Sequence, residues 1–364
     1  TAWEIAEFYT RSFLEDSKAL GLTPPDVLCK ATAHIPEQIA LISSLEAKGF
    51  TYRTDDGVYF DASKFPDYGR LAGGSAHISG LQEGARVQAN AQKRNATDFA
   101  LWKFSPLDKK RQMEWDSPWG RGFPGWHIEC SAMAMKYLGE SFDIHCGGVD
   151  HIPIHHSNEI AQSNAATGKP FVQIWMHGEF LLMNNAKMAK SEGGFVTVKA
   201  LKERGFDPLD YRYHCLTAHY RKQLDFAWEA LEAAPGARRR LKTFAEGLSG
   251  GDRPACADHV KAFDSALQDD LNVSQALGVV HDAMKASVPV GAKKALLQMA
   301  ERIFAVGLFE AEQALEPELQ SLVGQREAAR EAKNFALSDQ LRLALEERGV
   351  LVEDTKQGQK WRRK

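Results

Sequence analysis

The chain has 364 residues, enough for two or three domains, and its 45 lysines and arginines nearly balance 48 aspartates and glutamates for a formal net charge of -3. This balance argues against a protein that coats nucleic acid by bulk charge, although it leaves room for a local basic surface. The apolar stretches are too short to span a bilayer and the five cysteines are too scattered for a disulfide framework, so we expect a cytoplasmic protein with no membrane partner.

The first hundred residues predict two helices, a hairpin and a long irregular stretch. Apolar residues at helical spacing predict helices over 2–20 and 36–48. Two β-type runs on either side of an Asp-Asp-Gly turn predict a β-hairpin over 50–60. Residues 61–98 are rich in glycine and alanine, which indicates the loops of an inserted module.

From about residue 100, short apolar runs alternate with helix-like stretches. The apolar runs cover 99–102, 142–145 and 174–176, and helices are expected over 127–138 and 155–166. This alternation predicts an α/β domain with a parallel sheet. After about residue 225 the pattern is nearly all helical to Ala305. A helix-loop-helix from Pro317 to Gly349, a short strand over 350–352 and a basic tail follow.

Cysteine, histidine and glutamate recur in a pattern that fits a zinc site. His155 and Glu159 are four residues apart on an expected helix, about 40° apart around its axis, so both can point at one ion. With Cys130 they offer an imidazole, a carboxylate and a thiolate, all accepted by zinc. Helical direction favours His155 over His156, because we expect only His155 to share a face with Glu159. The alternative is a packed cysteine beside a surface ion pair.

A second pattern, K-M-A-K-S over 187–191, follows an apolar run and precedes two glycines. Two lysines on such a loop can place positive charge against a triphosphate, and Lys190 can stabilise the charge on the departing pyrophosphate. A bare pair of lysines is more often a solvated basic loop. Neither a P-loop nor a GxGxxG motif accompanies it.

Together these segments resemble cysteinyl-tRNA synthetase, a class I aminoacyl-tRNA synthetase, from about residue 1 to Lys364. The resemblance is carried by GWHIECSAM at 125–133, FDIH at 142–145, HH at 155–156, NEIAQS at 158–163, WMHG at 175–178, KMAKS at 187–191, LVED at 351–354 and WRR at 361–363. It implies an α/β fold, with a Rossmann-like class I catalytic domain that lacks its N-terminal part and carries an inserted module. An all-helical bundle and a small C-terminal anticodon-binding domain follow.

The resemblance also implies domain ranges. These are 1–37 for the remainder of the first half of the catalytic domain, 38–120 for the inserted connective module, 121–180 for the second half, 181–225 for the KMSKS-loop and stem-contact region, 226–310 for the helical bundle and 317–364 for the anticodon-binding domain. The implied activity is a cysteine–tRNA ligase, which activates cysteine with ATP to cysteinyl-adenylate and transfers it to tRNA(Cys). We expect a monomer with one Zn²⁺ per subunit, and Mg²⁺ with the ATP.

By resemblance, Cys130, His155 and Glu159 match three of the family's four zinc ligands. Zinc would select the substrate by its thiolate, which serine cannot imitate, so no editing module is needed. The cysteine pocket would be lined by Trp126 and His145.

The other implied sites concern ATP and tRNA. Lys187 and Lys190 would be catalytic, with Lys190 contacting ATP and Ala189 in place of the loop's serine. The implied adenosine-side residues are Gly147, Gly148 and Asp150. The positions that suit anticodon contact are Arg330, Lys333, Asp339, Asp354 and Trp361. Each could instead be a solvated helix residue, or in the case of Trp361 a packing lid. The basic tail would supply phosphate contacts.

The resemblance is incomplete at the N-terminal end. No His-x-Gly-His motif is present, and both that motif and the fourth zinc ligand would precede Thr1, so we expect this chain alone to be inactive. Cys29 and Cys146 are poor substitutes for that ligand. The alternatives are a non-catalytic or decayed tRNA-binding paralogue and a cysteine ligase that acts on an amino-sugar acceptor. The segment 317–364 favours tRNA over an amino sugar.

Overall fold

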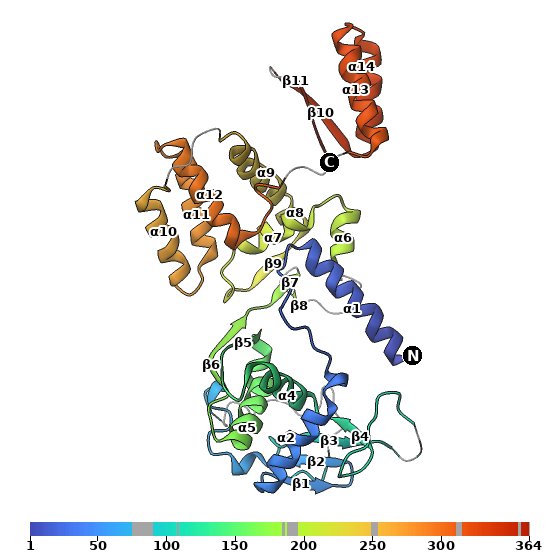
Figure 1. Cartoon of the computed structure of the whole chain (residues 1–364), viewed down its shortest axis with the longest axis vertical. Helices are drawn as coiled ribbons and strands as arrows, with labels where there is room; N and C mark the ends of the chain where they lie inside the picture. Colours follow the sequence, from blue (N-terminus) through green and yellow to red (C-terminus); the bar gives the residue numbers. More distant parts are fainter. Residues whose placement is uncertain are drawn as a thin grey trace. The chain divides into compact units, whose positions relative to one another are not determined.

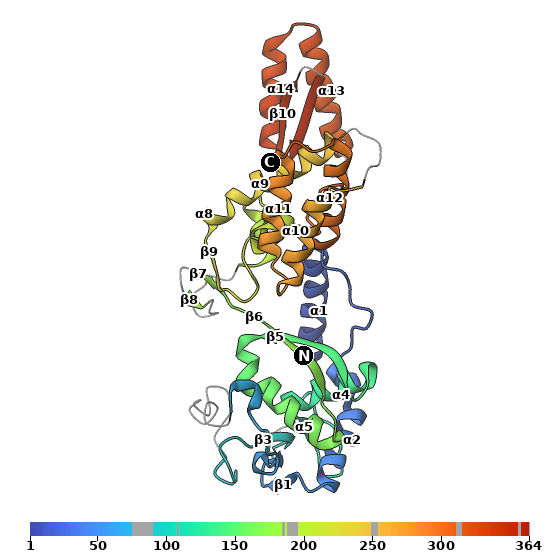
Figure 2. The same ribbon diagram turned by 90° about the vertical axis from the view of Figure 1, so that its left-hand side faces the viewer.

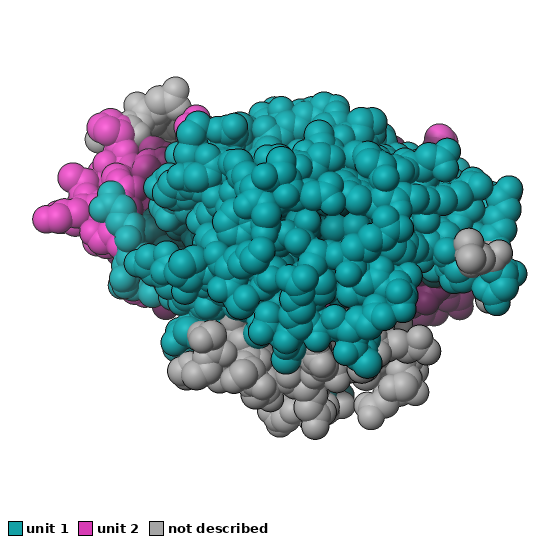
Figure 3. Space-filling model, turned by 90° about the horizontal axis from the view of Figure 1, so that it is seen from below, with its two compact units in different colours: residues 1–195, 215–230, 266–275 teal, residues 196–214, 231–265, 276–364 magenta. Residues whose placement is uncertain are grey.

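The computed structural model describes residues 1–74, 90–106, 108, 110–183, 186–187, 196–248, 254–310, 315–355 and 358–363. The chain forms two compact units, coloured separately in Figure 3. Unit 1 comprises 1–195, 215–230 and 266–275, and unit 2 comprises 196–214, 231–265 and 276–364. Each unit is therefore built from separated stretches of sequence, and the domain ranges given above stay predictions.

Unit 1 begins with the two expected helices, α1 (Ala2–Ala19) and α2 (Ile35–Ala47). A capping box between Thr1 and Glu4 starts α1, and among the described residues none of its side chains is buried. In contrast, α2 buries Ile42 and Leu45 in the core of unit 1. The expected boundary at residue 37 falls inside α2.

Four strands of unit 1 form an antiparallel sheet in the order β1-β2-β3-β4. They are β1 (Thr51–Thr54), β2 (Gly57–Phe60), β3 (Phe99–Phe104) and β4 (Gly122–Pro124). The hairpin predicted over 50–60 is confirmed as β1 and β2. The run at 99–102 was expected in the parallel sheet, and this is wrong, because β3 pairs antiparallel with β2.

The first parallel strand pair of unit 1 lies in a β-α-β segment. It consists of β5 (Phe142–Gly148), a 3₁₀ turn (Val149–His151), a π-helical turn (Ile152–His156), α5 (Ser157–Thr167) and β6 (Val172–Gly178). β5 and β6 pair in parallel from Phe142↔Val172 to Gly148↔Gly178, as predicted. The preceding helix α4 (Trp126–Leu138) packs against α2 and α5, as Figure 1 shows.

A small second sheet of unit 1 has the order β8-β7-β9. It contains β7 (Leu181–Met183), β8 (Ala186–Lys187) and β9 (Leu224–Phe226), with β7 antiparallel to β8 and parallel to β9. The Glu179 N–H donates a hydrogen bond to the carbonyl of Tyr220, 2.8 Å away, just before the parallel pair.

Two helices, α6 (Val198–Glu203) and α7 (Pro208–Leu216), precede residue 225. The nearly all-helical pattern expected after that residue is confirmed by α8 (Trp228–Leu231), α9 (Ala233–Glu246), α10 (Ala257–Gln268), α11 (Val273–Lys285) and α12 (Val290–Phe304). Arg238 of α9 pairs with Asp207 and Asp210 at 3.0 and 2.9 Å, and its Nε donates to the Val306 carbonyl at 2.7 Å. The Arg238 side chain thereby joins three segments of unit 2.

The C-terminal part consists of α13 (Pro317–Glu331), α14 (Phe335–Glu347), β10 (Val350–Thr355) and β11 (Gly358–Arg363). Figures 1 and 2 show the two helices side by side with the hairpin beside them. Residues 358–363 of the segment read from the sequence as a basic tail form β11, paired with β10 from Val350↔Arg363 to Thr355↔Gly358. Among the described residues, no helix combines the length and apolar character needed to cross a membrane.

Candidate metal centre

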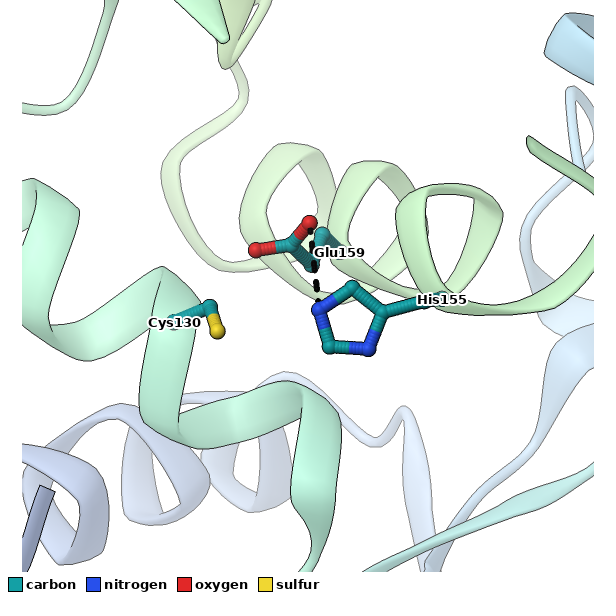
Figure 4. A group of neighbouring side chains, drawn as sticks. All are labelled: Cys130, His155 and Glu159. Carbon is teal, nitrogen blue, oxygen red and sulfur yellow. Dashed lines mark ion pairs between the residues drawn. The ribbon is translucent and has the colours of Figure 1, made fainter. Parts of the chain in front are cut away.

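Three side chains from two helical segments converge in unit 1. Cys130 lies in the second turn of α4, His155 in the π-helical turn before α5, and Glu159 in the first turn of α5. Their sulfur, ring nitrogen and carboxylate oxygen all lie within 4.8 Å of one another. Figure 4 shows the three side chains directed into the same space, with His155 Nε2 3.7 Å from Glu159 Oε2. The structure thus brings together the residues that the sequence assigned to zinc.

The carboxylate of Glu159 is the clearest indication of a bound cation. Its side chain has an exposed fraction of 0%, and neither oxygen has a hydrogen-bond partner within the described residues. A buried carboxylate without a partner is costly, and proteins satisfy such a group with a cation or a metal. Burial lowers the pKa of His155, and it lowers the pKa of His156 to about 2, so neutral rings surround the carboxylate. The donor set therefore fits zinc.

Cys130 needs a cation to become a thiolate. Burial raises the pKa of its thiol to about 12, with smaller contributions from the negative charges of Glu159 and Glu129 and from Cys29. Because metals bind the thiolate, occupation of the site would displace a proton from this sulfur. Among the described residues, neither Cys29 nor the exposed Cys146 joins the three-residue group.

Buried hydrogen bonds fix α4 against α5 and so fix Cys130 relative to Glu159. Gln162 Nε2 donates to Ser131 Oγ at 2.6 Å and to the His127 carbonyl at 2.6 Å, and Ser163 donates to Ser131 Oγ at 2.9 Å. The start of α4 is also constrained, because a Cβ on Gly125 would lie 1.9 Å from the Ala100 carbonyl oxygen. Only glycine allows β3 and α4 to approach this closely.

More histidines face this carboxylate than the sequence predicted. His145 Nε2 lies 3.2 Å and His156 Nε2 3.8 Å from Glu159 Oε2. The expectation that only His155 shares a face with Glu159 is therefore wrong, because residues three apart on a helix are neighbours as well as residues four apart. The ring of His155 is held at Nδ1 by His127 Nδ1, 2.9 Å away.

The residues assigned to the cysteine pocket surround the same group. Trp126, with 60% of its surface exposed, begins α4, and its ring meets that of His155 edge-on with centroids 5.7 Å apart. His145 projects from β5 toward Glu159, and its ring lies 4.9 Å from that of Trp175. Their role in binding cysteine stays a prediction. His177, in the WMHG segment, received no role from the sequence, although its ring holds that of His156.

The expected ATP residues are only partly described. Gly147 and Gly148 end β5 and Asp150 lies in the following turn. Lys187 ends β8, whereas Lys190 lies outside the described residues. A Cβ on Gly147 would lie 2.6 Å from the ring of a neighbouring histidine, so this glycine also makes room for the histidine cluster.

The expected anticodon residues have strong partners within the protein. Arg326, 2% exposed, forms a bidentate pair with Asp354 at 3.0 and 2.9 Å, and Arg330 approaches the same carboxylate at 2.8 Å. Asp339 pairs with a neighbouring arginine of α14 at 3.5 Å. Trp361 is partly buried against the core of this domain, as expected if it acts as a packing lid. Contact of these residues with tRNA stays a prediction.

Comparison with known proteins gives the family. The family described as tRNA synthetases class I (C) catalytic domain matches residues 1–236, and Cysteinyl-tRNA ligase anticodon binding domain matches residues 312–362. Cysteine–tRNA ligase 1 of Burkholderia lata is 50% identical over 364 residues, which cover 99% of this chain and 77% of that protein. The chain belongs to the cysteine–tRNA ligase family.

Other cysteine–tRNA ligases are similar over the same extent. The enzyme from Treponema denticola is 40% identical, and the match covers 99% of this chain and 80% of that protein. The enzyme from Thermococcus gammatolerans is 41% identical, and the match covers 99% of this chain and 81% of that protein. A solved methionyl-tRNA synthetase from Mycobacterium tuberculosis, in complex with methionyl-adenylate, superposes with a TM-score of 0.53 at 15% identity. The superposition covers 85% of this chain and 77% of the methionyl-tRNA synthetase chain. This likeness confirms the class I synthetase fold.

Proposed function

We propose that this chain serves in the ligation of cysteine to tRNA(Cys), with ATP consumed to form cysteinyl-adenylate and pyrophosphate, and AMP released on transfer. The observation that carries the substrate assignment is the group of Cys130, His155 and Glu159, whose buried carboxylate has no hydrogen-bond partner among the described residues. Support for tRNA as the acceptor, rather than an amino sugar, comes from the match of residues 312–362 to an anticodon-binding domain.

Cys130, His155 and Glu159 would hold Zn²⁺ by three donors. When bound, the zinc supplies a Lewis acid that prefers a thiolate to a hydroxyl donor, which is the main difference between cysteine and serine. Trp126 and His145 would border the space beside these donors, where their rings limit the size of the substrate side chain and exclude water. This arrangement discriminates by chemistry rather than by volume, since volume alone separates such similar side chains weakly.

The remaining assignments follow from the family. Lys187 and Lys190 would stabilise the triphosphate and the departing pyrophosphate, with Mg²⁺ bound to ATP. Gly147, Gly148 and Asp150 would border the adenosine. The tRNA-facing residues would be Arg330, Asp339, Asp354 and Trp361. We further propose a monomer located in the cytoplasm, which size-exclusion chromatography with light scattering and cell fractionation would check.

Zinc content and substrate choice test the central assignment. The purified protein should contain zinc and bind radiolabelled cysteine in preference to serine in equilibrium dialysis. Glu159→Gln should lose both properties, because the substitution removes a charged donor. Glu129→Gln is the matched control, since Glu129 lies beside Cys130 but outside the group, and it should retain both. Equal binding of cysteine and serine by the zinc-loaded protein would contradict the proposal.

Activity supplies the second test. Cysteine-dependent exchange of pyrophosphate into ATP reports adenylate formation, and cysteinylation of a tRNA(Cys) transcript reports transfer. Since exchange by this chain alone is expected to be near background, the comparison uses the chain joined to the expected His-x-Gly-His motif. There Lys190→Ala should reduce exchange far more than it reduces cysteine binding, because this lysine is assigned to the departing charge. An equal loss of binding and exchange would remove Lys190 from that role.

A further inference from the structure

We propose that His145, His156 and Glu159 form a second divalent-metal site, which shares only Glu159 with the Cys130–His155–Glu159 centre. One ligand atom from each of His145, His156 and Glu159 lies within 4.8 Å of the other two. The donors are two imidazole nitrogens and a carboxylate oxygen, a set typical of Zn²⁺, Co²⁺ and Ni²⁺. Only the first site contains a soft ligand, the Cys130 thiolate; the second has nitrogen and oxygen donors alone.

The carboxylate can serve both positions. Glu159 Oε2 lies 3.2 Å from His145 Nε2, 3.8 Å from His156 Nε2 and 3.7 Å from His155 Nε2, so the two histidine sets share one oxygen as their nearest neighbour. Both carboxylate oxygens are buried without a hydrogen-bond partner among the described residues. An oxygen shared in this way would place the two ions close together, as in the paired-metal sites of two-metal enzymes.

Each histidine set has its own supporting imidazole. His127 Nδ1 lies 2.9 Å from Nδ1 of His155, and His177 Nε2 lies 2.9 Å from Nδ1 of His156. In both pairs the Nε2 atom of the supported ring faces Glu159. Metal-binding histidines usually have their second nitrogen fixed in this way, which orients the ring toward the ion. His156 is only 1% exposed, so this orientation is maintained by packing as well.

The backbone accommodates this second set through Gly147. A Cβ at this position would lie 2.6 Å from Cε1 and 2.8 Å from Nε2 of His156, and 2.7 Å from Nδ1 of His151. Any other residue would therefore push the His156 ring away from Glu159. The strand that carries His145 thus also leaves the space that His156 fills.

The absence of a thiolate makes the second site the weaker one, so it fills only when the metal is in excess over the first site. If His145 borders the cysteine pocket, an ion held there competes with cysteine for the same space. This consequence rests on the proposed function, whereas the binding of the ion does not. Excess divalent metal should then weaken the binding of cysteine in equilibrium dialysis and leave the binding of ATP unchanged.

Cobalt titration of the metal-free protein tests the site, because a thiolate ligand gives Co²⁺ a charge-transfer absorption that nitrogen and oxygen donors do not. The wild-type protein should bind two equivalents, the first with and the second without this absorption. Cys130→Ser should bind cobalt without charge transfer. His156→Gln should retain the charge-transfer band and lose the second equivalent, and His177→Gln should weaken the second equivalent about 10–100-fold.

His34→Gln is the matched control, since this histidine of unit 1 bonds to the Lys30 carbonyl and the Tyr137 hydroxyl and takes no part in either set. It should bind both equivalents. Uptake of one equivalent by the wild-type protein, or survival of the second in both His145→Gln and His156→Gln, would overturn the proposal. Binding of two cobalt equivalents with unchanged affinity for cysteine would uphold the site and count against the proposed position of the cysteine pocket.

Discussion

Replacing Glu159 with glutamine should move the stability of the metal-free and metal-loaded protein in opposite directions. In the metal-free protein, the substitution removes a buried charge that has no hydrogen-bond partner among the described residues. The new amide can hydrogen-bond to a neighbouring imidazole, with His145 Nε2 nearest at 3.2 Å from the present oxygen. An unsatisfied buried polar group costs about 1–3 kcal/mol, and a charged one more, so relief of this order is expected.

The corresponding change in melting temperature is measurable. At about 2–4 °C per kcal/mol for a unit of 150–250 residues, the metal-free variant should melt roughly 2–12 °C above the wild-type protein. With zinc present at about 100 times its dissociation constant, the wild-type protein gains about 2.7 kcal/mol from binding. Glu159→Gln should lose most of this gain, because it lacks the charged donor.

Differential scanning calorimetry with a chelator and with excess Zn²⁺ distinguishes the two effects. Glu129→Gln is the control, because burial raises the pKa of Glu129 to about 7 without placing it among the donors. It should shift both melting temperatures by the same amount. If metal-free Glu159→Gln melts at or below the wild-type temperature, the carboxylate is not an uncompensated charge and the main argument for the cation is refuted.

Three further outcomes follow from the same geometry. Burial lowers the pKa of His127 from 6.5 to about 3, so the unfolded state takes up a proton at a higher pH than the folded state does. The contribution of His127 to metal-free stability is therefore complete above pH 6.5 and decreases as the pH falls toward 3. In urea titrations, His127→Gln should lose less stability over this pH range than the wild-type protein. Because the pKa of Cys130 is about 12, zinc binding at neutral pH should release about one proton from this thiol, seen by calorimetry in buffers of different ionisation enthalpy and absent in Cys130→Ser. Ser131→Ala should cost about 1–3 kcal/mol in urea unfolding, since it removes the partner of Gln162 and Ser163.

Local periodicity predicted the helices well because helical hydrogen bonds join residues close in sequence. The helices expected over 2–20 and 127–138 are confirmed as α1 and α4 within one or two residues. The partner of β3 was not predictable in this way, because its pairing with β2 joins residues about 40 apart and depends on the packing of the whole sheet. The segment 358–363 was missed because its charged, alternating residues also fit an exposed tail.

The candidate metal donors could be grouped from residue type and spacing, but their surroundings could not be predicted. A sequence shows that His155 and Glu159 can share a face, yet it cannot show that the carboxylate is buried without a hydrogen-bond partner among the described residues. The buried Arg326 is a similar case, because an arginine on an amphipathic helix is normally expected in solvent. Its bidentate pair with Asp354 becomes apparent only once β10 packs on α14, which in turn packs on α13.

The donors reach the site by two different routes, and this separates the two proposed metal positions. The histidines and Glu159 come from one continuous strand-turn-helix segment over 145–159, so local backbone sets their spacing. Cys130 comes from α4, and its position depends on the buried hydrogen bonds between Ser131 and α5. Ser131→Ala should therefore weaken the cobalt equivalent with charge-transfer absorption and leave the nitrogen–oxygen equivalent nearly unchanged. Equal weakening of both would show that α5, rather than α4, had moved.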